Sequence, residues 1–232
     1  MNSYKALNKQ TFTQNKFSLV PIRDRDKFKI MNWRNEQIYH LRQNKPLTKE
    51  SQENKLAYQK VLFYSGLQSY TDGEYQTALK SFEKAVALQK DATISARATF
   101  WKGESNYRLN NFKDALSDFN NFIGKSQASN TLEFEHVDYN IAYSYFKQKE
   151  YTSATDAFKK YISKNTDDEI RKNDSYLRIA DGYFVNSNYS SAINYYNKAI
   201  ETNGIDGDYA QFQKAICYGL TSNENLDFWL IL

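Results

Sequence analysis

Small and aromatic residues recur along the chain in a ladder of fixed spacings that is repeated four times. The first copy has spacings of 4, 3, 2, 3, 4 and 3 residues, and consists of Gly66, Tyr70, Gly73, Tyr75, Ala78, Phe82 and Ala85. The other copies open at Gly103, Ala142 and Ala180, so consecutive copies are offset by 37, 39 and 38 residues. Spacings of three and four place side chains on one face of an α-helix, and the short break between them indicates a turn. Each copy therefore predicts two helices joined by a turn.

Each ladder position has a steric reason. The small residue that opens a copy lets two antiparallel helices approach closely, and the aromatic residue four positions later fills the gap below it. The third position, occupied by Gly73, Asn110, Lys149 or Ser187, falls at the turn, where glycine and asparagine tolerate unusual dihedral angles. The second helix then begins with an aromatic residue, packs through an alanine and closes the core with another aromatic residue. The ladder therefore predicts a core in every copy.

The four copies resemble the tetratricopeptide repeat family over about residues 57–221. The segments that carry the resemblance are YSGLQSYTDGEYQTALKSFEKA, WKGESNYRLNNFKDALSDFNNF, IAYSYFKQKEYTSATDAFKKY and IADGYFVNSNYSSAINYYNKA. The resemblance implies an all-α fold in which helix-turn-helix repeats form a right-handed superhelical solenoid. The period is longer than the usual one of about 34 residues, and the proline that often follows the second helix is absent. Both departures predict longer helices or loops. An unrelated helical bundle with coincidental spacing is the alternative.

The ladder also predicts where the repeats begin and end. The expected repeats span about 51–90, 92–124, 131–164 and 168–203, and an unpaired ninth helix spans about 207–221. The intervening loops, 124–130, 164–168 and 202–207, are rich in Gly, Ser, Asn or Asp. We therefore expect an array over 51–232 and an N-terminal appendage over 1–50.

Composition supports this division. Residues 1–56 hold 12 Lys and Arg against 5 Asp and Glu, whereas residues 57–232 hold 19 against 22, and both prolines lie before residue 57. Residues 17–22 predict a strand, and residues 24–42 predict a helix with one broadly apolar side formed by Phe28, Met31, Trp33, Ile38 and Leu41. The basic charges of this segment are interleaved with acids, which favours a solvated helix face over nucleic-acid binding.

Residues 17–48 resemble the opening strand and first helix of the N-acetyltransferase superfamily. That superfamily holds the pyrophosphate of acetyl-CoA on an Arg/Gln-x-x-Gly-x-Gly/Ala turn at a helix start. All eight glycines of this chain lie outside the segment and none forms that turn, and the strand has no sheet partner later in the chain. We therefore expect an incomplete appendage, no cofactor and no enzymatic activity, with an acetyltransferase remnant or fusion as an alternative.

Other chemistry is sparse. His40 and His136 have no ligand-spaced partners, so we expect no metal site. A single cysteine, Cys217, excludes an intrachain disulfide. Residues 1–16 lack the apolar stretch of a signal peptide, and no apolar stretch of the sequence is long enough to span a bilayer. These features favour a cytoplasmic protein. The acidic run Asp167–Glu169 suits the start of the helix of repeat four.

The resemblance to tetratricopeptide repeats implies a scaffold that binds a protein or peptide partner in the groove lined by the first helix of each pair. In that family the groove positions lie three before, one after and five after the small residue. Carried onto this sequence, they are Phe63, Leu67 and Thr71; Phe100, Glu104 and Arg108; Tyr139, Tyr143 and Lys147; Leu177, Asp181 and Val185. The alternative for any one ring is packing between repeats.

Some family members clamp a partner's terminal carboxylate with Lys and Asn. Phe63, Leu67 and Trp101 stand at those positions here, so we do not expect that mode. The predicted groove is aromatic and aliphatic with a few charges, which suits an apolar or amphipathic segment. A self-associating assembly protein is a further alternative, because the chain ends on the apolar residues 228–232.

Overall fold

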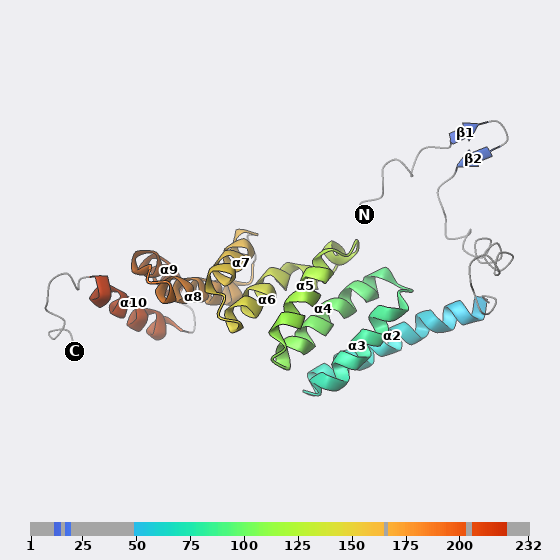
Figure 1. Cartoon of the computed structure of the whole chain (residues 1–232), viewed down its shortest axis with the longest axis horizontal. Helices are drawn as coiled ribbons and strands as arrows, with labels where there is room; N and C mark the ends of the chain where they lie inside the picture. The colour runs from blue at the N-terminus through green and yellow to red at the C-terminus, as the bar shows by residue number, and fades with distance from the viewer. Residues whose placement is uncertain (1–11, 15–16, 20–48, 165–166, 203–205, 222–232) are drawn as a thin grey trace.

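The structure is a computed structural model that describes residues 12–14, 17–19, 49–164, 167–202 and 206–221, with side chains described from Asn54 onward. Its main body is a row of helices that follow one another from α2 to α10 (Figure 1). Four antiparallel pairs make up the row: α2 (Lys49–Thr71) with α3 (Tyr75–Leu88), α4 (Ala92–Arg108) with α5 (Phe112–Ile123), α6 (Glu133–Lys147) with α7 (Tyr151–Ser163), and α8 (Glu169–Val185) with α9 (Tyr189–Glu201). A further helix, α10 (Gly207–Thr221), follows α9. The expected all-α fold of helix-turn-helix repeats is therefore confirmed over the described residues of this row.

The ladder residues form the core of each pair. The alanines at 78, 115, 154 and 192 are buried, and so are the aromatic rings of Phe82, Phe119, Phe158 and Tyr196 four residues beyond them. A Cβ atom added at Gly103 would lie 2.8 Å from the Phe119 ring, closer than carbon atoms can approach without a shift. The first and second helices of repeat two therefore touch at a point where only glycine leaves room.

The long period has a visible origin. The first helices α4 and α8 have 17 residues each, and α2 has 23. Between α5 and α6 the chain makes an extra 3-10 turn, η2 (Ala128–Asn130). The long period predicted longer helices or loops, and the structure contains both.

Polar side chains fix the helix starts and ends. The Asp91 carboxylate accepts hydrogen bonds from the backbone N–H groups of Thr93 and Ile94, and the Asp168 carboxylate accepts one from Arg171 at 3.0 Å. The acidic run at 167–169 thus opens α8, as expected. At the other end of a pair, the buried Gln59 donates from Nε2 to the carbonyl oxygen of Ala85 at 2.9 Å. That carbonyl belongs to the last turn of α3, where carbonyl groups have no hydrogen-bond donor within the helix.

The N-terminal segment carries a short antiparallel hairpin. Strand β1 (Phe12–Gln14) pairs with β2 (Phe17–Leu19), with Thr13 opposite Ser18. The expected strand over 17–22 is therefore present over 17–19, and its partner precedes it in the chain. The expected helix over 24–42 and the apolar residues 228–232 lie outside the described residues.

Candidate binding groove

A groove of about 760 Å³ runs across the first helices of consecutive repeats. We call it the central groove. Its walls come from the end of α2, the length of α4 and α6, and the start of α8. The lining residues are Tyr70, Arg97, Phe100, Trp101, Glu104, Tyr107, Arg108, Leu132, Glu133, Glu135, His136, Tyr139, Asn140, Tyr143 and Arg171. Second helices contribute none of them, because the ladder turns those helices to the opposite side of each pair.

The Glu104 carboxylate accepts hydrogen bonds from two neighbouring helices. It accepts one from the Tyr70 hydroxyl at 2.9 Å and another from the Asn140 side-chain amide. The Arg108 guanidinium donates to the same Tyr70 hydroxyl at 3.1 Å, and the rings of Tyr70 and Trp101 meet edge to face with centroids 5.0 Å apart. Side chains from α2, α4 and α6 therefore meet at one carboxylate.

The surroundings of Glu104 and Tyr107 shift the pKa values of both side chains. Burial raises the pKa of the Glu104 carboxyl above its ordinary value, although the Tyr70 and Asn140 hydrogen bonds and the positive charge of Arg108 act against that rise. Burial and the Glu104 charge raise the pKa of Tyr107 to about 12. Both groups of the groove therefore favour their neutral forms more than they would in water.

A second carboxylate, that of Asp174, positions two tyrosines that line the groove. The Tyr139 and Tyr143 hydroxyls both donate to one oxygen of Asp174, at 2.8 and 2.5 Å, and Arg178 donates to its other oxygen at 3.2 Å. The tyrosine rings lie edge to face with centroids 5.0 Å apart. Because Asp174 lies on α8 and the tyrosines on α6, these contacts join repeats three and four and hold the rings in place.

A third carboxylate of the groove, that of Glu133, is buried. One oxygen of Glu133 accepts hydrogen bonds from Arg97 at 2.8 Å and from the Trp101 indole at 3.0 Å. The other oxygen is buried without a hydrogen-bond partner. Nearby, burial and the charge of Arg171 lower the pKa of the His136 imidazole, which favours its neutral form.

The groove combines aromatic rings with hydrogen-bonded carboxylates. Aromatic rings supply contact area, and the three carboxylates are each engaged by donors from neighbouring side chains. Among the described residues, no group of three or more His, Cys, Asp or Glu side chains could hold a metal ion. No helix in the described part of the chain is long and apolar enough to cross a membrane.

The structure brings five of the expected groove residues together. Phe100, Glu104, Arg108, Tyr139 and Tyr143 all line the central groove. They come from repeats two and three and contribute both aromatic rings and charged groups to the lining.

The remaining expected residues lie elsewhere. Phe63 and Leu177 were expected at an exposed surface, but they are fully buried within their own repeats, where each packs among the ladder residues of the partner helix. Asp181 is buried and accepts hydrogen bonds from the Tyr196 and Tyr209 hydroxyls at 2.7 and 2.9 Å. Leu67 packs at the edge of the core of repeat one, and Lys147 is exposed outside the groove.

Several lining residues were not predicted from the sequence. Trp101 and Asn140 lie two positions before the small residue, and Arg97 and His136 lie six before it. Positions four apart share a helix face, so these residues extend the face that Phe100 and the other expected positions define. The helical period was the signal that could have identified them, because it applies along the whole length of each first helix.

Comparisons with known proteins agree with this architecture. Two family models, both described as tetratricopeptide repeat, match residues 69–130 and 137–167. These residues therefore carry tetratricopeptide repeats. No curated protein matches the chain significantly. The family matches do not touch residues 17–48, and the acetyltransferase resemblance of that stretch finds no support.

Solved structures share the fold at low sequence identity. The MamA protein is 19% identical with a TM-score of 0.58, over 70% of this chain and 81% of its own. The apo form of RapI is 16% identical with a TM-score of 0.60, over 83% of this chain and 55% of its own. YrrB, described as a TPR protein with an unusual peptide-binding site, is 15% identical with a TM-score of 0.57, over 71% of this chain and 78% of its own. At such identities the likeness concerns the fold alone.

Proposed function

We propose that this array of tetratricopeptide repeats is a non-enzymatic scaffold that binds a segment of a partner polypeptide in the central groove. The observation that carries the proposal is the groove itself, a hollow of about 760 Å³ built by the first helices of consecutive repeats. The peptide-binding site named for YrrB lends support by analogy of fold.

The lining indicates which kind of segment fits. Aromatic rings such as Trp101, Tyr107 and Tyr143 offer large contact areas with few rotatable bonds, so little entropy is lost when they are covered. Arg108 is exposed, and the Glu104 carboxylate accepts hydrogen bonds. An amphipathic segment with apolar side chains toward the rings matches this surface better than a strongly charged one. A cytoplasmic location is a separate prediction from the sequence, made because residues 1–16 lack the apolar stretch of a signal peptide and no apolar stretch is long enough to span a bilayer.

The test uses two exposed aliphatic residues at equivalent helix starts. Leu132, just before α6, lines the groove and is 83% exposed, whereas Ile170 at the start of α8 is 72% exposed and lies outside it. The full chain would be screened against an immobilised library of amphipathic peptides, and hits titrated by calorimetry. Leu132→Arg should weaken binding at least about tenfold, and Ile170→Arg should leave it unchanged.

Two outcomes would contradict the proposal. Equal losses for both variants would place binding elsewhere on the array, and the absence of any hit would remove the peptide-binding role. Phe100→Ala is a poor test, because that ring is buried against Phe119 and Phe122 and its loss should destabilise the repeat by about 3–5 kcal/mol.

A further inference from the structure

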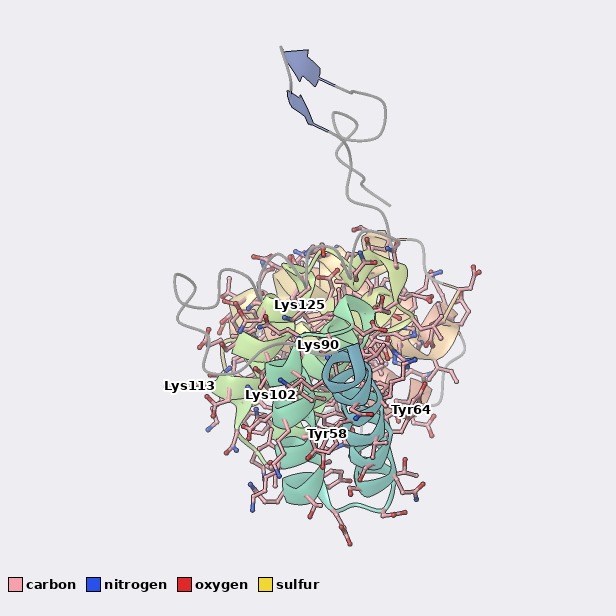
Figure 2. The ribbon with its side chains drawn as sticks, turned by 90° about the vertical axis from the view of Figure 1, so that its right-hand side faces the viewer. Tyr58, Tyr64, Lys90, Lys102, Lys113 and Lys125 are labelled. Atoms are coloured by element: carbon pink, nitrogen blue, oxygen red, sulfur yellow. The ribbon has the colours of Figure 1, made fainter. Side chains whose placement is uncertain are left out.

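The outer face of α2 presents three large side chains to solvent. Tyr58, Val61 and Tyr64 are 52%, 62% and 59% exposed. Figure 2 looks at the array from the end where α2 lies and labels both tyrosines on that helix. Their spacing of three residues puts them on neighbouring turns of one side of the helix. We call this surface the α2 outer face.

The repeat register shows that this face is ordinarily covered. Val61 lies five positions before the small residue Gly66. Its counterparts in the following repeats are Ala98, Val137 and Ser175, and all three are fully buried. The residues two positions before the small residue show the same contrast: Trp101, Asn140 and Arg178 are less exposed than Tyr64.

The covering element is the second helix of the preceding repeat. Ala98 belongs to the cluster that contains Phe82 and Ala85 of α3. Val137 belongs to the cluster that contains Phe122 of α5. In each case the cover comes from the helix that immediately precedes the first helix in the chain. The α2 outer face has the same geometry, and among the described residues nothing occupies it.

A second copy of the chain is a poor fit for this position. The described array ends in α10, which follows α9 as each first helix follows a second helix. A copy stacked end to end would therefore offer a first helix where every internal junction uses a second helix. The occupant that the register requires is a helix placed directly upstream of α2.

We propose that residues 24–42 form a helix that packs against the α2 outer face and caps the array at its first repeat. Their sequence predicts a helix with Phe28, Met31, Trp33, Ile38 and Leu41 on one side. Residues 43–48 separate it from α2 and include Pro46, a connection of the length usual between antiparallel helices.

The lengths agree with this arrangement. At about 1.5 Å per residue, a helix over 24–42 is about 28 Å long. Tyr64 lies 15 residues beyond Lys49, or about 22 Å along α2. A helix that turns back at residues 43–48 therefore reaches the whole apolar surface. Terminal repeats need such a cap, because an uncovered stacking face leaves apolar area in water.

Hydrogen exchange followed by mass spectrometry tests the proposal in the full chain. In the wild type, peptides from 24–42 should be protected. Val61→Glu should lower that protection by at least about tenfold while peptides from α4 to α9 keep theirs, because only the docked helix is released. Val185→Glu, at an exposed valine at the end of α8, is the matched control and should change nothing in 24–42.

Three results would overturn the proposal. The first is exchange in residues 24–42 that is as fast in the wild type as in Val61→Glu, and the second is protection that survives in that variant. The third is protection that grows with protein concentration alongside a doubled mass in sedimentation, which would assign the α2 outer face to a second copy. If Val61→Glu disturbs α4 to α9, Tyr58→Ala at the same surface replaces it, with the same expected loss of protection.

Discussion

Four residues of different chemistry share one backbone conformation at the third ladder position. Gly73, Asn110, Lys149 and Ser187 have φ angles of 81°, 63°, 64° and 58°. Left-handed backbone dihedral angles let the chain reverse direction after a helix. They cost free energy in residues with a Cβ atom, which glycine lacks. The turn between the two helices of a repeat is therefore set by geometry. Glycine and asparagine tolerate this conformation, whereas Lys149 and Ser187 adopt it at a conformational cost.

Exchanging the residues at this position should move stability in opposite directions. Lys149→Gly removes the left-handed strain and should stabilise the protein by about 0.5–1 kcal/mol, as the relief exceeds the entropy that glycine adds to the unfolded chain. Gly73→Ala should destabilise it by about 1 kcal/mol, and the cost is conformational alone, since nothing lies within 4 Å of the added Cβ. Urea midpoints measure both. A Lys149→Gly variant less stable than the wild type would show that the lysine side chain contributes more than its strain costs.

The raised pKa of Glu104 makes a pH-dependent contribution to stability. The folded protein favours the protonated carboxyl more than the unfolded chain does, mainly through burial. This contribution is therefore complete below the unfolded pKa of about 4.5 and is lost as pH rises through the higher folded pKa. Glu104→Gln, which cannot ionise, should be at least as stable as the wild type at pH 7.5, and its advantage should shrink toward pH 4.5.

Thermal melts of both proteins across that range measure the effect. Glu135→Gln, at an exposed glutamate of the same groove, controls for the loss of one charge. A Glu104→Gln variant that loses stability at pH 7.5 but not at pH 4.5 would mean that the hydrogen bonds and the charge of Arg108 outweigh burial, so that the folded pKa lies below the unfolded one.

At the scale of elements, carboxylates tie consecutive first helices together. Glu104 on α4 is bonded from both α2 and α6, Asp174 on α8 from α6, and Asp181 on α8 from Tyr209 on α10. In most of these contacts a tyrosine is the donor. Such pairs keep their hydrogen bonds while the tyrosine stays neutral, and burial raises the pKa values of Tyr70 and Tyr139 well above the ordinary range. The tyrosine-rich composition therefore serves the junctions between repeats as well as the core within them.

The elements themselves were largely predictable from the sequence, for a physical reason. The ladder reports which side of each helix meets its partner, and a helix pair cannot form without that match. The acidic start of α8 was predictable for a different reason, because carboxylates stabilise a helix N-terminus. The exact length of α2 did not, because its first turns lie before the ladder, where the sequence pattern is weak.

The groove was less predictable than the helices around it. Periodicity gives the rotation of one helix, whereas a groove depends on how side chains of neighbouring helices close over it. Phe63 and Phe100 hold the same register position, yet the first is fully buried and the second still reaches the groove. Asp181 looked exposed by register, but Tyr196 and Tyr209 converge on it from two other helices. The periodicity of a single helix cannot predict such contacts from other helices.

At the scale of the whole molecule, an array of this kind should respond to damage locally. Each repeat contacts its neighbours in the row, so stability is roughly a sum of repeat and nearest-neighbour terms. Phe119 in α5 and Tyr196 in α9 are fully buried counterparts in repeats two and four. Truncating either to alanine should cost about 3–5 kcal/mol in its own repeat. Native-state hydrogen exchange of Phe119→Ala should show faster exchange in α3 to α6 than in α8 and α9, whereas Tyr196→Ala should speed exchange in α8 to α10 and spare α3 and α4. If each variant instead raised exchange uniformly from α2 to α10, the row would unfold as one cooperative unit, and the coupling between repeats would be stronger than the stability of any one of them.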